Sequence, residues 1–248
     1  MTVETHRDAP GVFGKLPGFG DFFRRRLPKS FAEPMDAWLQ AGMEGSRKQL
    51  ADEWLQGYLT SPFWRFALSP GLCGESVATG VIMPSVDAVG RHYPLVIAIV
   101  LPTCGNPLSL PFEAEEWYAA AEDVALSTLG EDFRVGDFEA RIDELGSPNS
   151  TVVHQETAVK ALVPISAGNL GWTGGPEKVG DVIAAIYPVA LDRMARAKFA
   201  LYSVWWTSGS DRIPSAFLLY QGLPPAEDFA ALLCGPLEVE QTETLVWS

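Results

Sequence analysis

GKLPGFGDFFRRR (residues 14–26) and PSVDAVGRHYPL (residues 84–95) are the two most informative stretches of this chain. Each combines glycine, proline, a carboxylate and arginine within about a dozen residues. Glycine adopts backbone angles that other residues avoid, and proline fixes φ and lacks an N–H donor. We therefore expect each stretch to form a loop of one defined shape that holds its charged side chains in place.

The composition indicates a globular protein with an acidic surface. The 248 residues are 47% hydrophobic, and 18 Lys and Arg against 31 Asp and Glu give a net charge of -13. This charge opposes nonspecific attraction to nucleic acids and anionic membranes. The longest apolar run, Leu95 to Leu101, is far shorter than the ~20 residues of a membrane-spanning helix. We expect a cytoplasmic protein that binds no nucleic acid and is not inserted in a membrane.

Hydrophobic patterns predict an α/β protein. Short apolar segments bounded by Pro or Gly are typical of strands, and longer periodic segments that end at Gly are typical of helices. We expect a layered α/β sandwich with a central mixed sheet flanked by helices. The expected strands are Val12–Lys15, Phe63–Leu68, Thr79–Met83 and Tyr93–Leu101, with a hairpin of Phe199–Trp206 and Ser215–Tyr220. The expected helices are a long one from Phe31 to Leu55, which Gly42 and Gly45 could break, and Phe112–Leu129, Phe138–Leu145, Val179–Ala197 and Pro224–Leu233.

The same patterns predict the domain organisation. Residues 1–10 are expected to be a flexible tail, and residues 11–235 a single α/β domain. A sub-boundary near residues 147–150 is suggested by the sequence Ser147-Pro-Asn-Ser150. Residues 236–248 form an acidic C-terminal tail. These patterns do not determine the oligomeric state.

Catalytic templates match the two loops poorly. The glycines around Lys15 have the wrong spacing for a phosphate-binding loop, and a dinucleotide fingerprint is absent. Ser85, Asp87 and His92 are the residue types of a hydrolase triad, but Ser85 lacks the Gly-x-Ser-x-Gly turn. Asp21 and Asp87 could share a cation. The favoured interpretation is that both carboxylates accept loop amides or pair with arginines, so we expect no metal and no cofactor.

Two features suggest a protein-binding surface. Arg24, Arg25 and Arg26 form the one concentrated basic run of an acidic chain, and guanidinium groups suit carboxylate or phosphate partners. Trp205 and Trp206 are adjacent, so in a strand they point to opposite faces. One of the two must then lie against a second layer or a partner.

The two loops and their surroundings resemble the TagF family, accessory proteins of the bacterial type VI secretion system. The resemblance rests on Gly14-Lys15-Leu16-Pro17, Gly20-Asp21-Phe22, Trp38-Leu39-Gln40, Pro62-Phe63-Trp64-Arg65-Phe66, Gly80-Val81, Pro84-Ser85-Val86-Asp87 and Val89-Gly90-Arg91. It implies a layered α/β fold and a regulator that represses assembly or firing of the secretion machine after translation. It also implies a forkhead-associated scaffold protein as the partner.

The first hypothesis is therefore a noncatalytic regulator, with Asp21, Asp87 and Arg91 fixing the loops and Arg24 to Arg26 offering the surface. The residues expected at the binding site are Lys15, Asp21, Arg24, Arg25, Arg26, Ser85, Asp87, Arg91 and Trp206. One alternative is a small hydrolase, metal-dependent or Ser/Asp-based, that uses Asp21 and Asp87. Another is binding of a membrane or a phosphorylated protein through Lys15 and Arg24 to Arg26.

Overall fold

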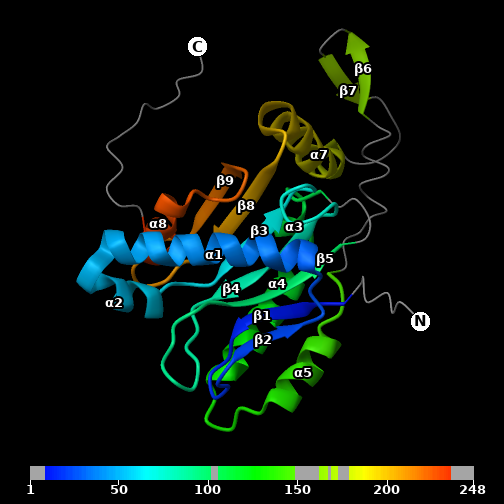
Figure 1. Ribbon diagram of the computed structural model, residues 1–248. Coiled ribbons are helices and arrows are strands. Elements are labelled where there is room, and N and C mark those ends of the chain that lie inside the picture. Colours follow the sequence, from blue (N-terminus) through cyan, green and yellow to red (C-terminus); the bar gives the residue numbers. More distant parts are fainter. Residues whose placement is uncertain (1–8, 102–105, 149–161, 167–168, 173–178, 236–248) are drawn as a thin grey trace.

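The structure is a computed structural model that describes residues 9–101, 106–148, 162–166, 169–172 and 179–235 (Figure 1). Residues 1–8 of the expected N-terminal tail, residues 149–150 of the expected sub-boundary and the expected acidic tail at 236–248 lie outside the described residues.

A seven-stranded sheet forms the centre of the fold, in the order β2-β1-β5-β4-β3-β8-β9. Its strands are β1 (Gly11–Lys15), β2 (Phe22–Arg25), β3 (Trp64–Leu68), β4 (Ala78–Met83), β5 (Leu95–Val100), β8 (Tyr202–Thr207) and β9 (Ala216–Gln221). Every pairing within it is antiparallel, so the α/β class is confirmed but the sheet is not mixed. A separate hairpin is formed by β6 (Leu162–Ser166) and β7 (Asn169–Trp172).

Helices cover both faces of this sheet (Figure 1). One face carries α1 (Lys29–Leu50), α2 (Trp54–Leu59) and α8 (Phe229–Cys234). The other face carries α4 (Glu115–Leu126) and α5 (Val135–Glu144), with α3 (Leu110–Glu113) before them. α7 (Val179–Phe199) packs beside β8. Three short 3₁₀ turns complete the described elements: η1 (Ala51–Glu53), η2 (Ser127–Leu129) and η3 (Ala226–Asp228).

Two hydrophobic cores follow from the alternation of side chains along the strands. In β3, Phe66 joins the core under α1, and Ala67 joins the core under α4 and α5. Val96 and Ile97 divide in the same way in β5. The central strands are buried along nearly their whole length, which explains why their sequences are mostly apolar and why that of β5 is apolar throughout.

The long first helix is interrupted later than the sequence suggested. α1 runs through Gly42, where an added Cβ would lie 2.3 Å from the ring of Phe229, so this glycine allows α8 to approach closely. The interruption falls at Ala51, whose φ is 44°. The glycines are thus packing positions of the helix and do not break it.

Candidate functional site: a platform of two loops

Asp87 holds the second glycine-bearing loop, between β4 and β5, in one conformation. Its Oδ1 accepts the backbone N–H of Val89 (3.0 Å) and of Arg91 (2.8 Å). Its Oδ2 accepts the Arg91 guanidinium at 2.7 Å and pairs with the Lys15 ammonium. The carboxylate is buried, and both of its oxygens are occupied by donors. The expectation that Asp87 accepts loop amides and pairs with Arg91 agrees with these contacts.

The loop between β1 and β2 is fastened to this second loop. Lys15, at the end of β1, reaches Asp87, and Arg91 donates to the carbonyl of Gly20 at 2.7 Å. The backbone N–H of Ala88 also donates to the carbonyl of Phe19 at 3.3 Å. The two stretches that stand out in the sequence therefore form one unit. We call the exposed residues at its tips the loop platform: Gly18, Gly20, Asp21, Ala88, Val89, Gly90 and Arg91.

Buried hydrogen bonds support the platform from below. Ser85 Oγ donates to the carbonyl of Lys15 at 2.8 Å. The hydroxyl of Tyr58 in α2 donates to the carbonyl of Ser85 and accepts its N–H, both at 2.9 Å. The strands, the loops and α2 are thus joined through Ser85. This residue, expected at a binding site, contributes by positioning.

The electrostatics keep Asp87 ionised. Burial would raise the pKa of the Asp87 carboxyl, but the hydrogen bonds from Lys15, Arg91 and Val89 outweigh burial and hold its pKa well below the usual range. A carboxylate held in this way is a poor proton acceptor at neutral pH. Asp87 is therefore suited to fixing the loops.

The residues of the hydrolase alternative make hydrogen bonds and ring contacts with other partners. Asp21 is exposed and accepts the N–H of Phe22 at 2.7 Å, whereas Asp87 is buried among other partners. His92 packs edge-on against Trp54 and Tyr58, and Ser85 Oγ is bound to Lys15. Within the described ranges, no group of three or more His, Cys, Asp or Glu side chains could hold a metal ion.

The arginine run does not form a free basic patch. Arg25 pairs with Glu139 and, at 3.1 Å, with Asp143, and Arg26 also pairs with Asp143. These carboxylates belong to α5, which the sequence did not place near β2. Of the three arginines only Arg24 is exposed, and it donates to the carbonyl of Leu27 at 3.1 Å. The run mainly attaches β2 to α5.

The two adjacent tryptophans point to opposite faces of β8, as predicted. Trp205 is fully buried against Trp38 and Phe66 under α1. Trp206 packs edge-on against Tyr118 of α4, with ring centroids 4.9 Å apart. Of the two alternatives for Trp206, a second layer or a partner, the structure has the second layer.

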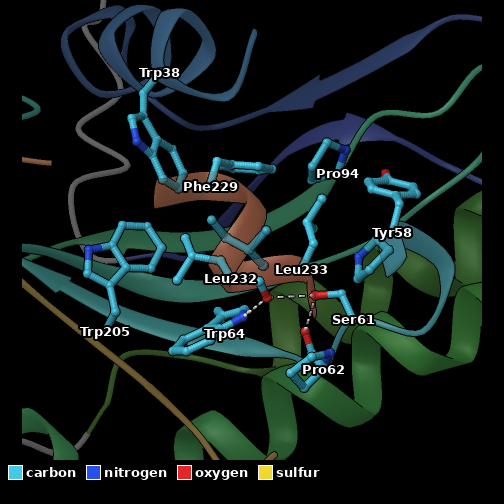
Figure 2. A pocket seen from close by; sticks show the side chains of 12 residues that line it. Trp38, Tyr58, Ser61, Pro62, Trp64, Pro94, Trp205, Phe229, Leu232 and Leu233 are labelled. Carbon is cyan, nitrogen blue, oxygen red and sulfur yellow. Dashed lines mark hydrogen bonds between the residues drawn. The ribbon is translucent and has the colours of Figure 1, made fainter. Parts of the chain in front are cut away.

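An apolar pocket lies between α1, α8 and the sheet (Figure 2). Trp64 Nε1 donates to the carbonyl of Leu232 at 2.8 Å, and Trp38 Nε1 donates to that of Pro224 at 2.7 Å. The volume of this pocket is about 30 Å³, the space of a single water molecule, whereas ligand pockets enclose roughly 300–1,000 Å³. Trp64 therefore fastens α8 to the sheet, Trp38 fastens α1 to the segment after β9, and the cavity leaves no room for a substrate.

Sequence reasoning missed an open hollow beside the platform. It has a volume of about 440 Å³ and lies between α1 and the second loop, lined among others by Arg47, Lys48 and His92. The Arg47 guanidinium lies 4.3 Å from the Trp54 ring centroid. Burial and the charge of Arg47 lower the pKa of His92 and so favour the neutral form of its ring. The helical spacing of Gln40, Glu44, Arg47 and Lys48 was a signal that these residues share a face.

The fold and site thus define an antiparallel α/β domain that presents a platform of two loops joined by hydrogen bonds. No helix among the described residues is long and apolar enough to cross a membrane.

Comparisons with known proteins identify the family. Residues 11–145 match the model of the TagF N-terminal domain, described as type VI secretion system-associated, and the chain belongs to this family. Its fold is similar to the crystal structure of PA0076 from Pseudomonas aeruginosa PAO1, with a TM-score of 0.75 and 36% sequence identity over 96% of this chain and 100% of that one. No protein with a curated description matched the sequence. The resemblance inferred from the loops is therefore confirmed.

Proposed function

We propose that this chain is a noncatalytic cytoplasmic regulator that holds type VI secretion in check after translation, by binding a forkhead-associated scaffold protein through the loop platform. Membership of a type VI secretion-associated family supports the first part of this proposal. The second part rests on the contacts that Asp87 makes with Lys15, Val89 and Arg91, which we call the lock.

The lock favours binding because it removes a cost of association. Ordering a mobile loop on binding opposes affinity, and a loop already held in its bound shape avoids most of that cost. The platform also presents an apolar side chain, since Val89 at its tip is 68% exposed. An apolar residue on a rigid protrusion, beside the exposed Arg91, is the kind of anchor that protein interfaces use.

The hydrolase alternative has weaker support. Its two carboxylates make separate contacts, and both oxygens of Asp87 are already taken by donors. Lys15 is buried in its ion pair, and Arg25 and Arg26 face carboxylates of α5. The same contacts weaken the reading in which these cations bind a membrane or a phosphorylated protein.

Copurification of the full chain with the scaffold protein from cells tests this proposal. Val89→Glu places a charge at the platform tip and keeps the backbone N–H of residue 89 that donates to Asp87, and it should reduce capture of the scaffold at least about tenfold. Met194→Glu is the matched control, because Met194 is 65% exposed on α7, at the other end of the molecule (Figure 1). Secretion should rise with the first variant only.

Two results would contradict the proposal. If the scaffold is never captured by the unmodified chain, direct binding is wrong. If both variants weaken capture equally while their melting temperatures match that of the unmodified chain, the platform is not the contact surface.

A further inference from the structure

The two edges of the seven-stranded sheet differ in their protection. At one edge, β2 has only four residues, two of them arginines, and charged side chains on a short edge strand discourage pairing with another chain. At the other edge, β9 has the sequence AFLLYQ, six residues without charge or proline. β9 pairs with β8, and no backbone group between Ala216 and Gln221 bonds to any other described element. Within the described part of the chain, β9 is thus an open, uncharged edge.

The hydrogen bonds of β8 show which groups of β9 face outward. Gly222 N–H donates to the carbonyl of Leu201, and Tyr202 is turned the other way, because its carbonyl accepts the N–H of Ser69. Bonded and non-bonded residue pairs alternate along an antiparallel ladder. Gln221, opposite Tyr202, therefore points its N–H and C=O away from β8, and so do Leu219 and Phe217.

Two of the side chains at these positions are apolar and exposed. Phe217 is 54% and Leu219 41% exposed, and they lie opposite Trp206 and Val204 on one face of the sheet. Open backbone groups and exposed apolar side chains thus coincide at the same residues. Such an edge is a template for a further strand.

We propose that a second copy of this chain covers this edge, with the two β9 strands paired antiparallel across a twofold axis at Leu219. In this register, Leu219 meets its own counterpart and Phe217 meets Gln221, so all three outward-facing residues donate and accept a hydrogen bond. A twofold contact brings identical groups together at its axis. β9 fits that requirement because it has no charge to repel its copy, whereas β2 would oppose its own arginines. The proposal is independent of the scaffold-binding function.

The molecular mass of the full chain in solution tests the contact. Sedimentation equilibrium between roughly 1 µM and 1 mM should show a reversible dimer. Leu219→Lys should weaken it at least about tenfold, because two ammonium groups would meet at the axis. Leu55→Lys is the control, an identical change on α2 at a residue that is 46% exposed.

A cysteine placed on the axis tests the register. Paired Cα atoms at a bonded site lie about 5.5 Å apart, within disulfide range, so Leu219→Cys should give an oxidised covalent dimer. Phe217→Cys should not, because its copy would lie about 13 Å away along the strand. If the chain stays monomeric over the whole concentration range, the proposal is wrong. This holds also if β9 then pairs with a strand of another protein. A dimer that Leu219→Lys leaves intact, or equal crosslinking of both cysteine variants, also overturns the proposal.

Discussion

Replacing different glycines of the two loops by alanine should cost very different amounts of stability. At Gly14, φ is 130° and an added Cβ would lie 2.1 Å from the carbonyl oxygen of Pro94. The backbone conformation costs of the order of 1–3 kcal/mol for alanine, and overpacking costs about 1–3 kcal/mol more. The contact is between backbones of paired strands, so relief requires β1 and β5 to separate. We expect Gly14→Ala to lose about 4 kcal/mol.

Gly90 and Gly20 provide the matched comparison. Gly90 has φ 83° with no atom within 4 Å of an added Cβ, so Gly90→Ala meets the backbone cost alone, about 1 kcal/mol. Gly20 has neither a positive φ nor a neighbour within 4 Å, and Gly20→Ala should leave stability unchanged or raise it slightly. For a chain of this size, a loss of about 1 kcal/mol lowers the melting temperature by about 2–4 °C. The melting temperature should therefore fall by about 8–16 °C for Gly14→Ala and by about 2–4 °C for Gly90→Ala, and it should not fall for Gly20→Ala. Equal losses at Gly14 and Gly20 would refute the geometric argument.

Three further outcomes are expected. The carboxyl of Asp87 has a lowered pKa, so its contribution to stability is present above its unfolded pKa of about 3.9 and is lost as the pH falls toward the folded value. The melting temperature of Asp87→Asn should therefore lie below that of the parent at pH 7, and the difference should shrink below about pH 4. Tyr118→Phe removes a buried hydroxyl that lies against Thr79, and calorimetry should show a loss of about 1 kcal/mol, near 2–4 °C. Burial raises the pKa of Cys73 to about 12, so mass spectrometry should find Cys73 unmodified by iodoacetamide in the folded chain and modified after unfolding.

The sequence was most informative where local chemistry determines structure. β3, β4 and β5 are mostly apolar segments bounded by turn residues, and their bounds were predicted within about two residues. The opposite orientations of Trp205 and Trp206 followed from the alternation of a strand. Asp87 was expected to accept loop amides because a carboxylate beside glycine and arginine commonly does so. These inferences needed only near neighbours in the chain.

Long-range contacts explain the remaining differences. Phe22–Arg25 was taken as loop, yet β2 pairs with β1 and its Arg25 meets Asp143 of α5, more than a hundred residues away. The parallel or antiparallel direction of strands depends on how helices cross the sheet, which no local pattern records. Gly42 reads as a helix breaker until Phe229 is seen against it. The open edge at β9 likewise becomes visible only when the order of strands is known.

The lock around Asp87 separates two meanings that the same residues can have. A carboxylate and an arginine on a glycine-bearing loop suggest catalysis when the carboxylate keeps a free oxygen for a proton or a metal ion. Here both oxygens of Asp87 are occupied, and the donors come from the second loop and from Lys15 of β1. The hydrogen bonds of such a carboxylate fix the conformation of the loops. What it leaves for function is the surface it holds still, and Val89 and Arg91 lie on that surface.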